Sequence, residues 1–337
     1  PLYVGETVSL HSLKDRLFPG GVQRTLRRWQ MRVFRRVRRR DLVRVLRDLG
    51  IPAGARICIH SQLSGLGYLP QGPGMVIDAV LEAVPGATVL MPTFPFPGAM
   101  LDWVQKGPVY DPRRTPSASG ALSEALRLRP DAIRGLHPTH PCAAAGPDAA
   151  LLIEGSEESQ EPFGPESSYG RYAASRNAWQ LLIHTNHTSI VHYFQEVAGM
   201  PNLFLPGLYE ARGLDWEGRE HRRMIRVHRP VLPLYVALPE YVWLPDFVLP
   251  FPSATRERLE RRFGAAAGAV LARQRELESA GVIRAVRYRD AEIAAVHVPP
   301  WGERVCEEMK ESFRKHPECY ELSALEEARA RGLLAPV

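Results

Sequence analysis

Three short runs of the sequence combine residue types that serve acid–base chemistry and phosphate binding. The first spans residues 60–67, where His60, Ser61 and Ser64 stand with two glycines directly after an apolar run. Free backbone N–H groups at such a turn can hold phosphate oxygens, and the hydroxyls can assist them. The run lacks the Walker lysine and the dinucleotide glycine pattern, so an ordinary turn is its structural alternative.

Histidines define the other two runs. His137 and His140 flank a proline, which favours an extended geometry between the two imidazoles. His192 is followed by Gln195 and Glu196, and a spacing of three or four residues places such side chains on one helical face. Histidine titrates near neutral pH, which suits proton transfer from an amine. A hydrogen-bonded structural role is the alternative for each histidine taken alone.

Two other chemistries fit the same runs less well. The His-x-x-His spacing at residues 137–140 and 184–187 is compatible with zinc, but no further ligand pattern accompanies it, so we expect no metal. Cys142 lies near His140 in the sequence, yet a lone thiol is more often a buried core residue than a nucleophile.

Apolar patterns predict the elements that must position these runs. Residues 56–60, 87–91 and 178–183 are short apolar segments typical of buried strands, and each ends in polar residues. A helix predicted from residue 74 separates the first two, an order that favours parallel pairing. In open α/β sheets the ligand crevice lies outside the carboxyl ends of the strands, so we expect the polar tips to converge there.

The rest of the chain shows more helical patterns and one glycine-punctuated region. We see no internal repeat and no clean boundary within residues 51–337, which we expect to form one α/β domain. Further helices are predicted from residue 119, from residue 190, and over 265–279, 303–314 and 322–333, with hairpins or an excursion over 207–229.

Composition restricts the class of protein. The 337 residues are 45% hydrophobic, which is enough for a full core. No run of about eighteen apolar residues and no signal-like start occurs, so we expect a cytoplasmic protein that does not enter a membrane. The four scattered cysteines are expected to be reduced thiols.

Eleven arginines between residues 24 and 47 more than account for the formal charge of +6. Apolar residues recur among them at helical spacing, as in helices docked by one face. We therefore expect residues 1–50 to form a basic helical segment that packs on the body and exposes its arginines. A nucleic-acid partner is not expected, because no aromatic stacking platform or zinc-finger spacing accompanies the charge.

Taken in order, the motifs resemble the aminoglycoside 3-N-acetyltransferase family, including its relatives that act on other amines. A single run carries little weight, but the series in family order and spacing is specific and covers roughly residues 42–200. The matching runs are residues 60–67, Leu90-Met91-Pro92-Thr93-Phe94, Asp111-Pro112 with Thr115-Pro116, Leu136-His137-Pro138-Thr139-His140, Gly146-Pro147-Asp148-Ala149, Pro162-Phe163-Gly164-Pro165 and Thr188-Ser189-Ile190-Val191-His192.

This resemblance implies a three-layer α/β/α sandwich around a central mixed sheet, with acetyl-CoA and an amine meeting in one cleft. It implies that the first loop lies beside the thioester and that His192 and His140 are the motif histidines. We expect three groups of site residues: catalytic His192, His140, Glu196 and Gln195; CoA-binding His60, Ser61, Gln62, Leu63, Ser64 and Thr93; and amine-binding Asn186, Ser189 and His137.

The sequence departs from the family pattern at three places. Gln62 stands where the first loop has a second serine, and Pro141-Cys142 replaces the serine after the His-Pro-x-His motif. The acidic residue expected three positions after His192 is Gln195, and Glu196 follows one place later. These departures leave the acceptor open.

We therefore predict a CoA-dependent N-acyltransferase in which an amine of a small polar substrate attacks the thioester directly, with His192 as base and His140 second. One alternative is a biosynthetic acyltransferase whose acyl donor is CoA, an acyl carrier protein docked on the arginines, or another acyl donor. The other is a non-catalytic binding protein on a degenerate acyltransferase fold. The sequence leaves the acyl group and the oligomeric state open, a homodimer included.

Overall fold

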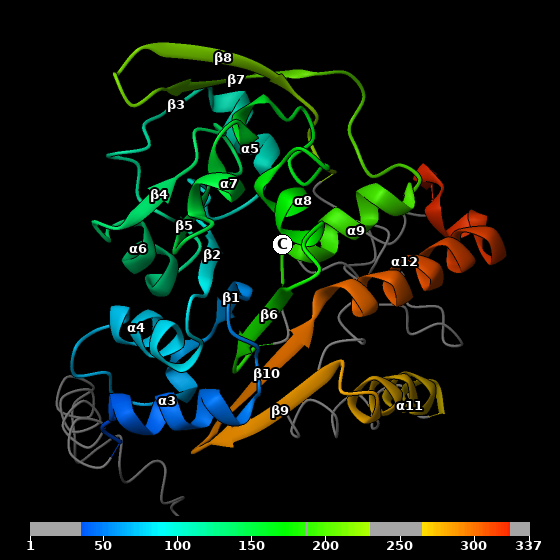
Figure 1. Cartoon of the computed structure of the whole chain (residues 1–337). Coiled ribbons are helices and arrows are strands. Elements are labelled where there is room, and N and C mark those ends of the chain that lie inside the picture. The colour runs from blue at the N-terminus through cyan, green and yellow to red at the C-terminus, as the bar shows by residue number, and fades with distance from the viewer. Residues whose placement is uncertain (1–34, 186–187, 230–264, 324–337) are drawn as a thin grey trace, which may run out of the picture.

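A mixed sheet of seven strands organises the computed structural model, which describes residues 35–185, 188–229 and 265–323 (Figure 1). The strand order is β4-β5-β2-β1-β6-β10-β9. The strands are β1 (Arg56–Ser61), β2 (Thr88–Pro92), β4 (Ala132–Arg134), β5 (Cys142–Ala145), β6 (Ala178–Ile183), β9 (Ile283–Tyr288) and β10 (Ala291–His297).

The centre of the sheet is parallel, as the strand and helix order predicts. β1 pairs in parallel with β2 on one side and with β6 on the other. The outer pairs β2·β5, β4·β5, β6·β10 and β9·β10 are antiparallel. The carboxyl ends of β1, β2 and β6 therefore meet at one edge, which confirms the expected convergence of the three strand ends.

Helices cover both faces of the sheet, so the predicted three-layer sandwich is confirmed (Figure 1). Side chains alternate along β1: Ile57 and Ile59 pack into the core on one face, and Cys58 into the core on the other. The first face carries α3 (Arg39–Asp48), α4 (Gly74–Ala83) and α6 (Ala121–Arg127); the second carries α7 (Ala149–Ile153), α8 (Ser168–Ala173), α9 (Ile190–Ala198) and α12 (Val298–Lys315).

A second, three-stranded sheet lies beside the sandwich (Figure 1). Its strands are β3 (Val109–Tyr110), β7 (Tyr209–Leu214) and β8 (Glu220–Ile225), and the β7–β8 hairpin confirms the predicted turn region. A small apolar cluster joins this hairpin to α5 (Met100–Lys106). The described chain also contains α11 (Ala265–Ser279), which confirms the helix predicted there, and the short 3-10 turns η1 (Leu63–Gly65), η2 (Ser156–Glu158) and η5 (Pro317–Tyr320).

The arginine segment is described only from Arg35 onward, and the arginines before it lie outside the described residues. Within α3, Leu42 and Leu46 are buried, and Arg39 forms a 2.8 Å ion pair with Glu82 of α4. This half of the segment therefore packs by its apolar face, as the spacing predicts, while Arg44 stays exposed.

Two features differ from the sequence-based expectations. The β9–β10 hairpin that extends the sheet beyond β6 was not predicted, because its strands mix charged and apolar residues. α12 begins at Val298, ahead of the predicted residue 303, because two prolines occupy its first turn, where no intrahelical N–H bond is lost. Residues 324–333 of the last predicted helix lie outside the described residues. None of the helices described is both long and apolar enough to cross a bilayer.

Candidate active site

His140 lies at the end of a hydrogen-bonded chain that starts at His137. His137 Nε2 faces the carbonyl oxygen of Ser159 at 3.2 Å, so this nitrogen carries the proton and Nδ1 accepts. The backbone N–H of His140 donates to that Nδ1 at 3.0 Å. Thr139 Oγ1 stands 3.2 Å from His137 Nδ1 and 3.0 Å from His140 Nδ1, so one hydroxyl couples the two rings.

His192 projects from the first turn of α9 and is held by the residue at the expected acid position. Its Nδ1 lies 2.8 Å from Oε1 of Gln195, which is fully buried. An amide oxygen only accepts, so Nδ1 carries the proton and Nε2 presents a lone pair. Gln195 thus orients the ring as a carboxylate would, but without a charge.

Glu196 does not take over as the partner of His192. One residue further along α9, its side chain points elsewhere and contacts His228 Nε2 at 2.6 Å. The same carboxylate oxygen accepts the backbone N–H of Phe163 at 3.2 Å. The carboxylate missing from the His192 motif therefore exists nearby, but it belongs to a different histidine.

The ring of Phe163 is the common neighbour of these histidines. The centroid of the Phe163 ring lies 4.9 Å from that of His140, 4.9 Å from that of His192 and 5.4 Å from that of His228. His192 and His228 are 5.5 Å apart. The two motif histidines are therefore brought to one place, and both remain partly exposed.

Burial keeps these imidazoles neutral at pH 7. It lowers the pKa of His192 to about 4 and that of His228 to about 3, and it lowers the pKa of His140 well below its usual value, with neighbouring imidazoles adding to the effect. Burial and then the Glu161 carboxylate raise the pKa of Glu196 to about 9. The His228–Glu196 contact has the geometry of an ion pair, but both shifts disfavour charge, so we describe the pair as sharing one proton without net charge.

The first loop lies at the carboxyl end of β1, and His60 ties it to α9. The backbone N–H of Ser189 lies 3.0 Å from His60 Nε2, and the Ser189 hydroxyl is 3.2 Å away. The side-chain amide nitrogen of Gln180, Nε2, on β6 is 2.8 Å from His60 Nδ1. His60 thus joins β1, β6 and the start of α9.

Beyond His60 the loop turns through η1 and exposes Gln62 and Ser64, while Ser61 and Leu63 are partly buried. Gly65 packs flat on the ring of His184, where an added Cβ would meet ring atoms at 2.4 Å. The loop is therefore a turn that exposes polar side chains on one side and packs against His184 on the other.

Three of the expected site residues lie away from the exposed surface or outside the described residues. The Thr93 side chain is fully buried, donates to the Pro141 carbonyl at 3.0 Å and contacts Arg134. His137 is 2% exposed and has hydrogen-bond partners within the protein at both ring nitrogens, one of them the backbone N–H of His140. Their expected contacts with CoA and with the amine stay predictions. Asn186 lies outside the described residues.

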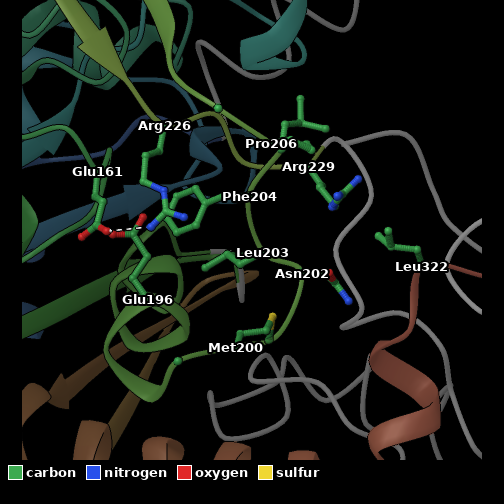
Figure 2. Close-up of a pocket in the computed structure, with 13 residues that line it drawn as sticks. Glu161, Glu196, Met200, Asn202, Leu203, Phe204, Pro206, Arg226, Arg229 and Leu322 are labelled. Carbon is green, nitrogen blue, oxygen red and sulfur yellow. Dashed lines mark hydrogen bonds and ion pairs between the residues drawn. The ribbon is translucent and has the colours of Figure 1, made fainter.

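A cavity of about 560 Å³ opens beside Glu196, and no histidine is among its lining residues (Figure 2). Glu196 contributes to its wall, and Figure 2 shows Glu161 and Arg226 next to Glu196, with the Phe204 ring close by. No residue of the first loop lines this cavity. The arrangement therefore has two parts, a loop at the strand ends and a cavity at the far end of α9, and His192 lies on α9 between them.

Sequence reasoning missed His228, Phe163 and Gln180 as site residues. His228 follows β8, in a region without a matching motif, and only its contact with Glu196 reveals it. Phe163 lies in the recognised Pro-Phe-Gly-Pro run, which was the available signal. Gln180 is a polar residue inside an apolar strand, a pattern that already indicates a buried hydrogen bond.

Comparison with known proteins gives a consistent picture. The family model described as aminoglycoside 3-N-acetyltransferase matches residues 58–300. Aminoglycoside N(3)-acetyltransferase VIII of Streptomyces fradiae is 34% identical over 160 residues, which cover 43% of this chain and 56% of that protein. Aminoglycoside N(3)-acetyltransferase VII of Streptomyces paromomycinus is 32% identical over 180 residues, covering 49% and 62%. The matched segments thus span less than two thirds of either curated relative.

Solved structures share the fold over a larger part of the chain. The aminoglycoside acetyltransferase AAC(3)-Xa superposes with a TM-score of 0.61 at 25% identity, covering 82% of this chain and 93% of that one. AAC-VIa bound to sisomicin gives 0.60 at 25%, covering 82% and 98%. The AAC-IIIb binary complex with CoASH gives 0.61 at 21%, covering 82% and 97%, which is evidence for the fold alone.

Proposed function

Because the chain belongs to the aminoglycoside 3-N-acetyltransferase family, we propose that it is an enzyme that transfers the acetyl group of acetyl-CoA to an amine of a small polar substrate. The observation that carries this proposal is the neutral imidazole of His192, fixed by Gln195 with Nε2 available and set beside His140. This geometry suits a general base better than a metal ligand or a nucleophile.

The reaction needs no covalent enzyme intermediate. The amine nitrogen attacks the thioester carbonyl carbon, and a C–N bond forms while the carbonyl oxygen becomes an oxyanion. The nitrogen then loses a proton to His192 Nε2. Collapse of the tetrahedral intermediate breaks the C–S bond, and the departing thiolate takes the proton back from the imidazolium. His140 is the second candidate for this proton transfer.

The low pKa of His192 is compatible with this role. A neutral imidazole is already in the form that accepts a proton at pH 7. The nitrogen bound to the new tetrahedral carbon is far more acidic than a free ammonium, so a weak base suffices for it. A general base of this kind contributes about 10² to 10⁴ in rate.

For the donor, we propose that CoA lies along the first loop. Gln62 and Ser64 are exposed there, and His60 braces the loop against Ser189 at the start of α9. Ser189, which contacts His60 at the strand ends, could then donate a hydrogen bond to the oxyanion of the tetrahedral intermediate. Removing one such donor typically costs about 3 kcal/mol of transition-state stabilisation. The acetyltransferase family to which the chain belongs supports the choice of donor.

For the acceptor, we propose an aminoglycoside or a related polyamine. Relatives named as aminoglycoside N(3)-acetyltransferases and a sisomicin complex of AAC-VIa support this class. Gln195 and Gln62, two of the residues that depart from the family pattern, do not line the cavity beside Glu196. We therefore expect them to change the reaction rate and the contacts with CoA, and not the choice of acceptor.

Two measurements test the proposal. Calorimetry with acetyl-CoA should show binding, and thiol detection should show CoA release that depends on sisomicin. His192→Ala is expected to lower kcat/KM by about 10² to 10⁴, whereas His297→Ala, at the end of β10, should leave it unchanged. Absence of acetyl-CoA binding removes the proposal, and an unchanged rate in His192→Ala removes the assignment of the base.

A further inference from the structure

The hydroxyl of Thr139 lies between two imidazoles and has a single proton to donate. Its Oγ1 is 3.2 Å from His137 Nδ1 and 3.0 Å from His140 Nδ1, and Thr139 is fully buried. A hydroxyl donates one hydrogen bond and accepts through its lone pairs. The ring that receives the proton therefore decides the tautomer of His140, and with it what the other nitrogen of His140 can do.

Backbone donors already occupy the His137 side of this hydroxyl. Because His137 Nε2 donates to the Ser159 carbonyl at 3.2 Å, Nδ1 of the same ring has a single lone pair to offer. The backbone N–H of His140 donates to that lone pair at 3.0 Å, and the N–H of Thr139 approaches it at 3.3 Å. The hydroxyl proton therefore goes to the nearer acceptor, His140 Nδ1, and His140 carries its own proton on Nε2.

The Nε2–H of His140 is fixed in direction and left available. In the described part of the chain His140 Nε2 has no hydrogen-bond partner, yet it is not one of the buried atoms that lack one, because the residue is partly exposed. The ring contacts those of Phe94 and Phe163, whose centroids are 4.6 Å and 4.9 Å away. A donor held in place before the reaction is the kind of group that stabilises a developing negative charge.

His192 has the opposite tautomer. Its Nδ1–H donates to Gln195 Oε1 at 2.8 Å, so its Nε2 presents a lone pair. Both motif histidines pack on Phe163, each with 4.9 Å between ring centroids. In the tetrahedral intermediate the attacking nitrogen needs an acceptor for its proton, while the oxyanion needs a hydrogen-bond donor. The two imidazoles supply one of each.

We propose that His140 donates its Nε2–H to the oxyanion of the tetrahedral intermediate, as a second donor besides Ser189, while His192 is the base. This inference rests on the proposed function and gives His140 a role other than that of second base. No bond to His140 forms, and its proton stays on Nε2 while the C–N bond forms and the C–S bond breaks. Thr139 and His137 are positioning residues, because they act only through His140.

Replacement of His140 separates a donor from a base, since a glutamine amide donates a hydrogen bond but takes up no proton near neutral pH. His140→Ala should lower kcat by about 10² to 10³, the effect of one lost oxyanion donor. His140→Gln should keep at least about tenfold more of the rate than His140→Ala. Its acid limb should stay at the wild-type pH, because that limb belongs to His192. His297→Gln, at the end of β10, is the matched control and should leave the rate unchanged.

Two further measurements test the positioning of His140. Thr139→Val removes the hydroxyl at nearly constant volume and should lower kcat about tenfold with the KM for acetyl-CoA unchanged, and Thr139→Ser should recover most of the loss. A merely structural Thr139 would lower the urea midpoint without this split. Nitrogen NMR of histidine-labelled protein reads the tautomer without turnover. The His140 signals, identified by their loss in His140→Gln, should show a proton on Nε2 and none on Nδ1.

Equal losses of rate in His140→Ala and His140→Gln overturn the inference, and so does a proton on His140 Nδ1 or an unchanged rate in His140→Ala. A wild-type protein that releases no CoA from acetyl-CoA in the presence of sisomicin instead overturns the proposed function, and the oxyanion role falls with it. The NMR spectrum then still decides whether the Thr139 hydroxyl holds His140 in the donor tautomer, so the two failures are distinguishable.

Discussion

At the scale of single residues, the His192 motif carries an amide where the family sequence pattern has an acidic residue. Gln195 stands at that sequence position, and its Oε1 lies 2.8 Å from His192 Nδ1. Orientation and tautomer are preserved, because an amide oxygen and a carboxylate oxygen both accept from Nδ1–H. What is lost is the negative charge that would stabilise an imidazolium.

We therefore predict that Gln195→Glu strengthens His192 as a base. The new carboxylate should raise the pKa of His192, so the acid limb of the kcat/KM profile should move to higher pH by about one unit or more. Near pH 7.5 the rate should rise, by up to about tenfold, as Brønsted behaviour requires. The pH–rate profile with saturating acetyl-CoA is the measurement.

Gln71→Glu, at an exposed turn before α4, adds the same charge away from the histidines and serves as control. An acid limb that stays in place in Gln195→Glu would show that His192 is not the group titrating in the rate.

At the scale of elements, the site depends on how closely two strand ends approach. β1 and β6 pair in parallel from Arg56↔Ala178 to Ser61↔Ile183, so the turn after β1 lies directly over His184, the residue after β6. Gly65 makes that contact possible because it has no Cβ. His184 itself has a positive φ of 54°, an uncommon backbone conformation for a non-glycine residue.

Gly65→Ala is accordingly predicted to displace the first loop. Its Cβ would lie 2.4 Å from the His184 ring, so either the ring or the loop must move. We expect a loss of about 1–3 kcal/mol in unfolding free energy and weaker acetyl-CoA binding, measured by urea unfolding and calorimetry. Gly74→Ala has no atom within 4 Å of its Cβ and should be neutral in both measurements. Equal behaviour of the two variants would mean that the loop does not need this contact.

At the scale of the whole molecule, the fold buries several histidines at the cost of acid stability. The pKa of His137 and that of His192 are lowered to about 4, that of His228 to about 3, and that of His140 also falls. Unfolded histidines titrate near 6.5, so between pH 6.5 and 4 the unfolded state binds more protons than the folded one. The folded state must therefore lose stability as the pH falls through this window.

Glu196 acts in the opposite direction. Its pKa is raised to about 9, so the folded state holds the extra proton, and this contribution is lost as the pH rises toward 9. Four lowered histidines outweigh one raised carboxyl group, each being worth at most about 1.4 kcal/mol per pH unit. Urea midpoints should therefore drop clearly from pH 7 to pH 5, before most surface carboxylates titrate. Midpoints that stay level or rise would contradict the neutral, buried state of these imidazoles.

Most of the central fold was predictable because local patterns and sheet rules agree there. The apolar runs that became β1, β2 and β6 are short and largely buried, and a helix separates the first two, so they allow few topologies. The β9–β10 hairpin was not predictable in this way, since Arg284, Arg287 and Glu292 interrupt its apolar pattern. Its place in the sheet depends on β6, about a hundred residues earlier in the chain.

By itself the sequence determined the parallel centre of the sheet, the motif histidines and the family, because these depend on local periodicity and on short runs whose order is readable. Only the tertiary structure decided which carboxylate meets which histidine. Gln195 and Glu196 are both within reach of His192 on the helix, so helical spacing does not choose between them. His228, in the segment after β8, contacts Glu196, and no spacing in the sequence encodes that contact. Tertiary packing also decided that Thr93 and His137 are buried, since whether a polar residue faces a ligand or the core depends on what packs against it.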